Sequence, residues 1–343
     1  MKPVLVLKFG TASITTPTGE LYEPVLADIA RQVAALHLHY NIVLVSSGAV
    51  GAGRRFLRDY RGDLTQRKAA AAVGNPLLLG IYSRYFAQYG IPVAQSLCER
   101  HHFASRDQFL QLKNTYHELW ANGIIPIANE NDVVSSRELK FSDNDELATL
   151  IAVGFGAERL LLCTSVGGLL DANGQIIRHV PAFDAAVFGV VRPDKSATGL
   201  GGMTSKLTFA KLATRLGVRV VIFGMQTENA INQAVTGNIG TVFDAQPVSV
   251  SARNRWLGSG SLAVGQVTVD AGAVNALHRR NSLLAVGVRA VPGEFAAGEV
   301  IEILDETGEV IAVAKARLSS DDLTARLGQP KVEVANASDI VLF

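Results

Sequence analysis

Short apolar runs alternate with segments of helical periodicity along most of this chain, and this alternation limits the possible folds more than any other feature. The run Val4–Lys8 is rich in branched residues and is typical of a strand buried on both faces. Strands separated by helices pair in parallel, because each helix returns the chain to the same edge of the sheet. We therefore predict an α/β fold, an αβα sandwich with a mainly parallel central sheet. The predicted strands are 4–8, 42–46, 91–94, 124–128, 160–163 and 218–223, and the predicted helices are about 65–89, 107–122, 145–155 and 205–216.

One of these helices has a proline near its middle. The helix at about 65–89 contains Gly74-Asn75-Pro76. Proline lacks the N–H that a helix interior needs, and its ring collides with the preceding turn. We therefore expect this helix to break near Pro76.

The character of the chain changes near residues 244–259. Before this point long helices separate the strands, whereas after about Ser261 short strands and glycine turns dominate. At 343 residues the chain is also too long for one ordinary domain. We place a large first domain at 1–250 and a small β-rich second domain at 260–343. The strands expected in the second domain are 266–269, 286–288, 300–304, 310–315, 332–334 and 340–342, and the helix is 271–279.

Composition excludes several classes of protein. With 48% apolar and 18% charged residues the chain is neither disordered nor fibrous, and a net charge of +1 gives no general attraction for nucleic acid or anionic membrane. The two cysteines, Cys98 and Cys163, are too few for a disulfide framework or a zinc site. The longest uncharged stretch, 32–53, is interrupted by polar residues, and the N-terminal apolar run is shorter than a signal peptide core. We expect a soluble cytoplasmic protein.

Two glycine-containing loops follow the first two predicted strands. Lys8 and Gly10 stand at the end of the first strand, where a lysine can reach a phosphoryl group and glycine lets backbone N–H groups approach it. The segment 46–53 contains Ser47 and three glycines, which can line an anion with N–H donors. Each loop has a plain structural reading as well, a surface lysine in one case and a tight strand-to-helix turn in the other. Neither matches a Walker A or GxGxxG pattern.

Two further polar segments are more informative. Asn129-Glu130-Asn131-Asp132 follows a predicted strand, and Asp143-Asn144-Asp145 opens a predicted helix soon afterwards. Helix capping accounts for one of these side chains, or two, but not for both clusters. Short amides and carboxylates can hold an ammonium group, a magnesium ion or a substrate carboxylate. Later, Gly201-Gly202-Met203-Thr204-Ser205-Lys206 leads into a helix, as suits a triphosphate, although a mobile glycine loop is the alternative.

Taken together, the four segments predict a site for phosphoryl transfer to an anion. It would contain two lysines, two glycine loops and a cluster of carboxylates and amides. A carboxylate acceptor is already ionised, so the reaction needs no general base. Its main obstacle is repulsion between two anions, which lysines, N–H donors and magnesium relieve.

The same motifs, in the same order, resemble those of the glutamate 5-kinases, a family with the amino-acid kinase fold. The motifs are Leu7-Lys8-Phe9-Gly10-Thr11, Ser46-Ser47-Gly48-Ala49, 126–132, 143–145 and 201–206, and the likeness extends over nearly the whole chain. The tail, with Asp270-Ala271-Gly272-Ala273 and Gly298-Glu299-Val300-Ile301, is similar to a PUA domain.

The resemblance implies phosphorylation of the L-glutamate side chain by ATP with Mg²⁺, giving L-glutamyl 5-phosphate at the start of proline synthesis. L-Proline would be a feedback inhibitor, and the assembly would be a homo-oligomer, a dimer or tetramer. The catalytic positions matched are Lys8, Lys206, Asp143 and Asp145. The glutamate-binding positions are Ser47, Gly48, Asn129, Asp132 and Asn144. The nucleotide-binding positions are Lys8, Gly10, Thr11, Thr164, Ser165, Gly201, Gly202, Met203 and Lys206, and no side chains form a metal site.

Three residues depart from the family pattern: Ala12, Ser165 and Leu200 stand where serine, aspartate and threonine are usual. All lie on the nucleotide side, so they leave open a catalytically weak sensor of proline or glutamate. Another kinase of the same fold, acting on a different acid or a phosphate monoester, is a further alternative. An RNA-binding PUA protein is a third, but 251–343 holds nine Lys and Arg against eleven Asp and Glu, which disfavours nucleic acid.

Overall fold

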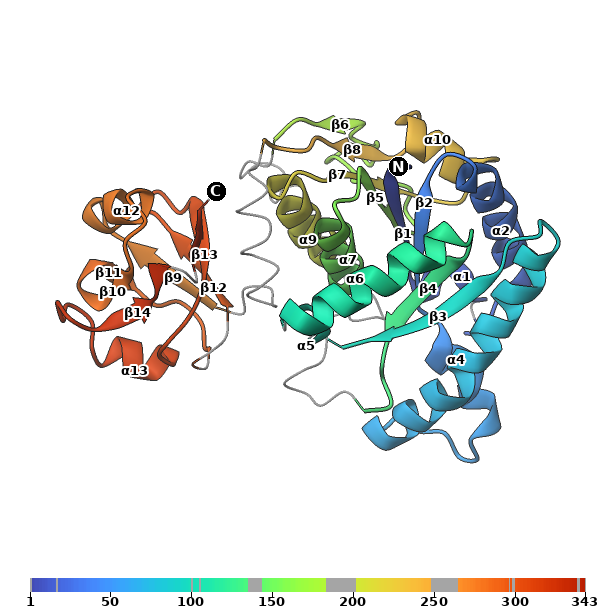
Figure 1. The fold of residues 1–343 in the computed structure, drawn as a ribbon, viewed down its shortest axis with the longest axis horizontal. Coiled ribbons are helices and arrows are strands. Elements are labelled where there is room, and N and C mark those ends of the chain that lie inside the picture. Colours follow the sequence, from blue (N-terminus) through green and yellow to red (C-terminus); the bar gives the residue numbers. More distant parts are fainter. Residues whose placement is uncertain are drawn as a thin grey trace. The chain divides into compact units, whose positions relative to one another are not determined.

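The structure is a computed structural model of the 343-residue chain. It describes residues 2–16, 18–99, 101–104, 106–134, 144–182, 202–247, 265–295, 297, 300–337 and 340–342. The chain divides into two compact units, a first unit of residues 1–100 and 110–247 and a second unit of residues 101–109 and 248–343 (Figure 1).

The first unit is built on an eight-stranded sheet of order β3-β4-β2-β1-β5-β7-β8-β6. Its neighbouring strands are parallel except for β7 and β8, which are antiparallel. The predicted, mainly parallel sheet is thus confirmed. The strands are β1 (Val4–Phe9), β2 (Asn41–Ser46), β3 (Val93–Cys98), β4 (Ile125–Glu130), β5 (Arg159–Cys163), β6 (His179–Val180), β7 (Arg219–Phe223) and β8 (Thr241–Phe243).

Helices cover both faces of this sheet (Figure 1). On one face lie α2 (Glu23–His37), α4 (Leu64–Ala87) and α10 (Ala230–Thr236), and the other face is covered by α6 (Arg106–Ala121), α7 (Asn144–Phe155) and α9 (Met203–Arg215). In α2 the buried residues recur at helical spacing and form one stripe that packs inward, whereas α7 is buried on all sides from Asp145 to Phe155. The shorter helices of this unit are α1 (Thr11–Ile14), α3 (Ala49–Gly53) and η1 (Arg54–Phe56), whereas α5 (His101–Ala104) belongs to the second unit.

Helix α4 is continuous, so the expected break near Pro76 is wrong. Proline costs the helix one backbone hydrogen bond, but the same helix buries Leu78, Tyr82 and Phe86 in the main core. Burial of three large side chains contributes several kcal/mol, each about 1.5–3 kcal/mol, and this exceeds the cost of about 3 kcal/mol for an interior proline. Tertiary packing therefore overrides the local signal.

The glycines of 46–53 serve packing more than they form an open loop. Residues Ala49–Gly53 form helix α3, which leaves only Ser47 and Gly48 between it and β2. A Cβ on Gly53 would lie 1.9 Å from the carbonyl oxygen of Ala70, and one on Gly74 would lie 1.7 Å from that of Ala49. Glycine is required because α3 and α4 touch backbone to backbone. The plain reading of this segment, a strand-to-helix turn, describes most of it.

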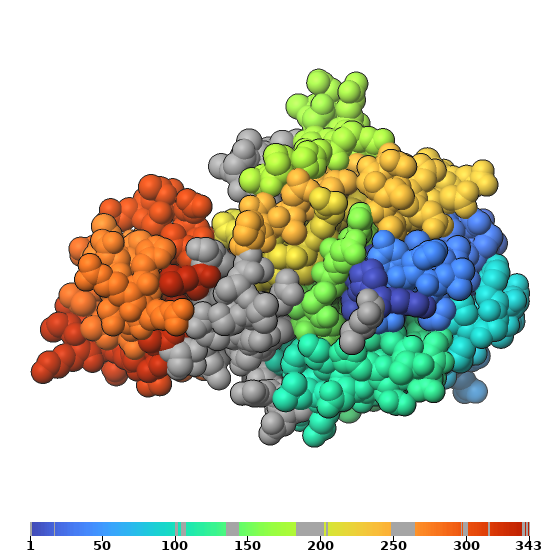
Figure 2. Space-filling model, turned by 45° about the horizontal axis from the view of Figure 1, so that its top comes forward, coloured from blue at the N-terminus to red at the C-terminus, as the bar shows by residue number. Residues whose placement is uncertain are grey.

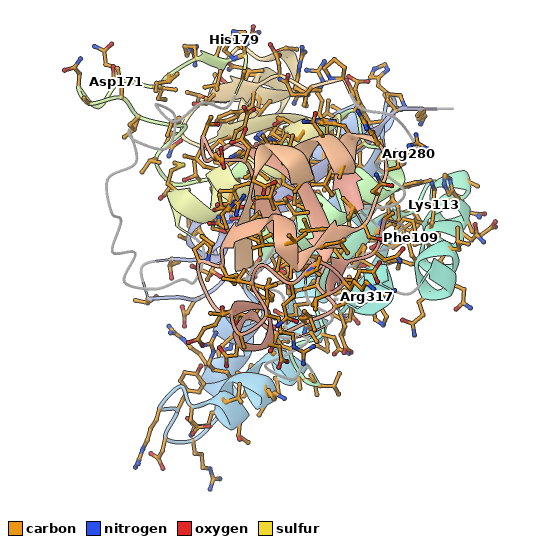
Figure 3. The ribbon with its side chains drawn as sticks, turned by 90° about the vertical axis from the view of Figure 1, so that its left-hand side faces the viewer. Phe109, Lys113, Asp171, His179, Arg280 and Arg317 are labelled. Carbon is orange, nitrogen blue, oxygen red and sulfur yellow. The ribbon has the colours of Figure 1, made fainter. Side chains whose placement is uncertain are left out.

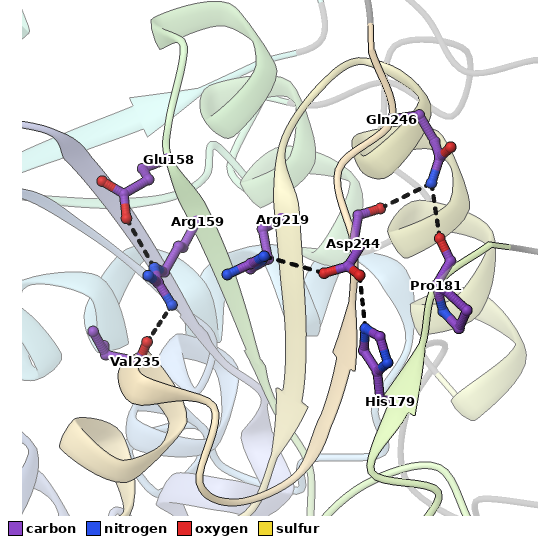
Figure 4. A network of polar contacts seen from close by, with 8 residues as sticks. All are labelled: Glu158, Arg159, His179, Pro181, Arg219, Val235, Asp244 and Gln246. Atoms are coloured by element: carbon purple, nitrogen blue, oxygen red, sulfur yellow. Dashed lines mark hydrogen bonds and ion pairs between the residues drawn. The ribbon is translucent and has the colours of Figure 1, made fainter.

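A polar network ties the edge strand β6 to β7 and to the segment after β8 (Figure 4). The Asp244 carboxylate lies 2.6 Å from His179 Nε2 and 3.2 Å from Arg219 Nη2. Gln246 Nε2 donates to the Pro181 carbonyl at 2.9 Å. The segment that carries β6 projects from the surface (Figure 2), and Asp171 and His179 lie at its periphery (Figure 3).

The second unit has a five-stranded sheet of order β11-β9-β12-β13-β15 and a two-stranded sheet of β10 and β14. Its helices are capped by side chains: Asp270 accepts from Ala273 N and Ser319 accepts from Asp322 N. Arg317, labelled in Figure 3, pairs with Glu333 at 2.8 Å. The elements are β9 (Gly265–Val269), α12 (Ala271–His278), β10 (Leu283–Leu284), η2 (Ala285–Gly287), β11 (Val288–Ala290), β12 (Val300–Leu304), β13 (Val310–Lys315), α13 (Ser320–Thr324), β14 (Glu333–Ala335) and β15 (Ile340–Leu342).

Among the residues that the structure describes in both units, no helix combines the length and the apolar character needed to cross a bilayer.

Candidate functional site

The candidate residues gather where neighbouring strands of the first unit end. Strand β1 lies between β2 and β5, where the strand order reverses: β2, β3 and β4 lie on one side of β1, and β5 to β8 lie on the other. In parallel sheets, ligands bind beyond the carboxyl ends of strands at such a point. Lys8 is the last but one residue of β1, Asn129 is the last but one of β4, and Ser47 and Thr164 directly follow β2 and β5. The backbone N–H of Ser47 donates to the Phe9 carbonyl at 3.0 Å and holds the ends of β1 and β2 together.

Two lysines meet at one carboxylate in this region. Lys8 Nζ lies 2.5 Å from Asp145 Oδ1, and Lys206 Nζ lies 3.0 Å from Asp145 Oδ2. The three residues come from β1, the first turn of α7 and the first turn of α9, and α7 packs against both other elements. All three are buried, with Asp145 fully so. The fold thus brings together residues that are far apart in the sequence.

The charges of this group favour an anion. Burial raises the pKa of Asp145, but the adjacent ammonium groups of Lys8 and Lys206 outweigh it, so the pKa lies below its usual value of 3.8. Asp145 is therefore ionised at neutral pH, and two ammonium groups share one negative charge. The remaining positive charge sits at the ends of the strands, where low dielectric strengthens its attraction for a negative ligand. A Cβ on Gly10 would lie 3.4 Å from Lys8 Nζ, so a bulkier residue there would crowd the lysine head.

A chain of amide side chains runs beside the lysines. Asn144 Nδ2 donates to Ser47 Oγ at 2.9 Å and to Asn129 Oδ1 at 2.8 Å. Asn129 Nδ2 in turn donates to Asn75 Oδ1 at 2.9 Å. These contacts join the loop after β2, the end of β4, the start of α7 and the middle of α4. The predicted glutamate-side residues Ser47, Asn129 and Asn144 are thereby brought together.

The loop after β2 depends on Gly48. This residue has φ of 104°, a left-handed conformation that residues with a Cβ rarely adopt. It turns the chain from β2 into α3 directly after Ser47. Asp132 lies, partly buried, in the turn that follows β4.

The nucleotide-side residues lie at the ends of β1 and β5 and at the start of α9. Thr11 opens α1, and Met203 opens α9, with Gly202 as its N-cap. Thr164 N donates to the Phe223 carbonyl at 2.7 Å, and Gln226 Nε2 donates to the Ser165 carbonyl. Asp143 and Gly201, like the variant position Leu200, lie outside the described residues.

Sequence reasoning missed three residues of this region. Asn75 and Tyr82 reach it from α4, and Tyr82 Oη is 2.9 Å from Ser46 Oγ. Gln226 reaches Ser165 from the loop after β7. A polar residue on the buried face of an apolar helix is the one signal that could have identified Asn75. The segment Gly74-Asn75-Pro76 instead led to the prediction of a helix break.

The described residues do not fit a resident metal ion. They contain no group of three or more His, Cys, Asp or Glu side chains that could hold one. Asp145, the fully buried carboxylate at the ends of the strands, is paired with two lysines. A hard cation such as Mg²⁺ needs oxygen ligands that are not already neutralised in this way.

Comparison with known proteins gives a consistent result. Residues 3–224 match the model of the amino acid kinase family, and residues 265–337 match the PUA domain. The chain is 36% identical to the glutamate 5-kinase of Klebsiella pneumoniae subsp. pneumoniae, covering 96% of this chain and 93% of that protein. It is 38% identical to the glutamate 5-kinase of Synechococcus elongatus, over 94% of this chain and 91% of that protein. The glutamate 5-kinase of Escherichia coli O1:K1 / APEC is 36% identical, over 96% and 93%.

Proposed function

The chain belongs to the amino acid kinase family, and from this premise we propose that it is a glutamate 5-kinase. It transfers the terminal phosphoryl group of ATP to the side-chain carboxylate of L-glutamate. The products are ADP and L-glutamyl 5-phosphate, and the reaction begins proline biosynthesis. Beyond the full-length similarity to named glutamate 5-kinases, the observation that carries the proposal is the pairing of Lys8 and Lys206 with Asp145.

The two lysines stabilise the phosphoryl group during transfer. Negative charge is spread over its oxygens in the transition state, and preorganised cations lower the barrier without having to reorient. Asp145 acts as a positioning residue, because its two carboxylate oxygens hold both ammonium groups in place. We assign Asp143, two residues earlier in the sequence, to the same task. A general base has no part in the reaction, since the acceptor carboxylate is already ionised at neutral pH.

The hydroxyl and amide groups at the ends of β2 and β4 bind L-glutamate. Ser47, Gly48, Asn129, Asp132 and Asn144 form this part of the site. A zwitterionic amino acid needs donors for its carboxylate and acceptors for its ammonium group. A cluster of amides, a hydroxyl and a carboxylate supplies both kinds, and the hydrogen bonds of Asn144 to Ser47 and Asn129 support its shared role.

ATP occupies the ends of β1 and β5 and the start of α9. Backbone N–H groups at Gly10, Thr11 and Gly202 suit its phosphates, as they do at other glycine-rich helix starts. The remaining nucleotide contacts are Thr164, Ser165, Gly201, Met203 and the lysines. Mg²⁺ would enter with ATP, and its charge would offset that of the phosphates during transfer.

The family membership also leads us to propose how the enzyme is organised and regulated. L-Proline inhibits it by feedback, the chain assembles as a homo-oligomer, either a dimer or a tetramer, and it acts in the cytoplasm. The kinase domain spans 1–250 and the PUA-like domain spans 260–343. Inhibition kinetics test the effect of L-proline, sedimentation tests the oligomeric state, and limited proteolysis tests the domain boundary.

The decisive experiment is trapping of acyl phosphate with hydroxylamine in the presence of ATP and magnesium. Glutamate, aspartate, N-acetylglutamate and carbamate are compared as acceptors. Selective turnover of glutamate is expected. Selective turnover of another acid would support the phosphoryl-transfer chemistry but refute glutamate as the substrate. If none of the four acids were turned over, the proposed kinase activity would be refuted.

Asp132→Ala tests the assignment of the glutamate side. Because Asp132 is proposed to contact glutamate and not the nucleotide, KM for glutamate should rise by about tenfold or more while KM for ATP changes little. Equal losses for both substrates would contradict the assignment.

A further inference from the structure

The hydrogen bonds of the amide chain have only one consistent direction. The backbone N–H of Glu130 donates to Asn129 Oδ1 at 2.9 Å, and a backbone N–H is never an acceptor. Asn129 therefore presents its oxygen to Glu130 and Asn144, and its nitrogen to Asn75. Asn144 must meet Asn129 Oδ1 with its nitrogen, which also donates to Ser47 Oγ. The orientations of all three amides follow from one backbone group.

This direction leaves an acceptor at one end of the chain. Both hydrogens of the Asn144 amide nitrogen are used, and Asn144 Oδ1 is inaccessible to solvent with no hydrogen-bond partner among the described residues. An unpaired buried oxygen costs free energy, unless a ligand satisfies it. An ammonium group is a pure donor and satisfies such an oxygen.

Asn75 supports the other end of the chain. It is 5% exposed, and its Oδ1 accepts a hydrogen bond from Asn129 Nδ2 at 2.9 Å. Seven residues later on the same helical face, Tyr82 contacts Ser46. Helix α4 thus holds the ends of two parallel strands, β4 through Asn75 and β2 through Tyr82. Gly74, next to Asn75, packs α4 directly on α3.

We infer that Asn75 is a positioning residue for substrate recognition. Through Asn129 it keeps the Asn144 amide oriented so that Asn144 Oδ1 accepts the ammonium group of the substrate. Without Asn75, the Asn129 nitrogen is left as a donor without this acceptor, and of the contacts that orient the Asn129 oxygen toward Asn144 only the Glu130 N–H remains. The inference rests on the proposed function, because it concerns the glutamate part of that site.

The test compares Asn75→Leu, which removes the acceptor at similar size, with Asn75→Asp, which retains one. Two constants are measured for each enzyme: KM for glutamate, and the inhibition constant of glutarate, which lacks the ammonium group, as a competitor of glutamate. In Asn75→Leu, KM for glutamate should rise by about tenfold or more while the glutarate constant changes by less than about threefold. KM for ATP should not change.

Asn75→Asp should keep the preference for glutamate over glutarate, because either protonation state of the new carboxyl accepts from Asn129 Nδ2. A negative charge on this carboxyl repels glutarate, which carries two negative charges and no ammonium group, more than glutamate, so it does not remove the preference. Val73→Ala, an exposed position two residues earlier in α4, is the matched control and should change neither constant. Circular dichroism establishes that each variant is folded, and the aspartate variant carries the test if the leucine variant is not.

The outcomes separate this inference from the proposed function. Failure of the wild type to phosphorylate glutamate refutes the proposed function. With an active wild type, equal weakening of glutamate and glutarate in Asn75→Leu means that Asn75 acts only on the fold, and the inference is wrong. It is equally wrong if Asn75→Asp loses the preference for glutamate over glutarate.

Discussion

Replacement of Asp145 by asparagine isolates the central electrostatic feature of the site. The substitution keeps the size of the side chain and removes its charge. Lys8 and Lys206 then remain 4% and 6% exposed, beside a neutral amide. Because the fold buries these ammonium groups against Asp145, their desolvation is no longer compensated.

The expected loss of stability is large, although the substitution exchanges only one side-chain atom. Removal of one partner from a buried ion pair costs about 3–5 kcal/mol, because the remaining charge stays buried. A unit of this size loses roughly 2–4 °C of Tm for each kcal/mol, so the first unit should melt about 6–20 °C earlier. Turnover should fall strongly as well, since neither lysine is then held where charge develops.

The difference in stability between the wild type and Asp145→Asn should depend on pH. The pKa of Asp145 is lowered by folding, so its contribution to stability is present above its unfolded value near 3.8 and is lost as pH falls through the folded value. Below its folded pKa, which lies under 3.8, the wild-type carboxyl becomes protonated and resembles the variant amide. Urea unfolding at several pH values should therefore show a large gap at pH 7 that narrows in acid.

Glu158→Gln provides the control for this experiment. Glu158 also forms an ion pair, with Arg159 at 3.0 Å, but its side chain is 46% exposed, so little change is expected at any pH. If Asp145→Asn proved as stable and as active as the wild type, the two lysines would not depend on this carboxylate, and the electrostatic account of the site would be refuted.

Three other substitutions probe helix α4. Gly74→Ala should destabilise the first unit by about 3 kcal/mol or more, because its Cβ would overlap the Ala49 carbonyl, and thermal melting measures this. Gly80→Ala in the same helix, with nothing within 4 Å of the new Cβ, should instead stabilise by up to about 1 kcal/mol; the opposite ranking would contradict the packing described. Tyr82→Phe removes the hydrogen bond to Ser46 and should lower the free energy of unfolding in urea by about 1 kcal/mol. It should also raise KM for glutamate, and an unchanged KM would show that Tyr82 does not support the glutamate site.

Most elements of both units could be predicted from the sequence, but the predicted strand 286–288 is wrong, because Ala285–Gly287 form the 3-10 helix η2 and strand β11 begins only at Val288. Runs such as Val4–Lys8 form strands, because a continuous run of branched apolar residues is typical of a strand that is buried on both faces of a sheet. The break at Pro76 was predicted wrongly because local propensity is small beside the burial of Leu78, Tyr82 and Phe86. The short strands β6 and β8 were also missed, since two or three residues give no periodic signal.

What the sequence determined by itself was the order of chemical groups along the chain: a lysine after the first strand, amides and acids after a later one, and a second lysine at a helix start. Tertiary structure alone decided that Lys8 and Lys206 share Asp145, and that Asn75 completes a chain of amides through Asn129. Such pairings join residues that are tens of positions apart. Periodicity and propensity report only on near neighbours, whereas these distances are set by which strands lie side by side in the sheet.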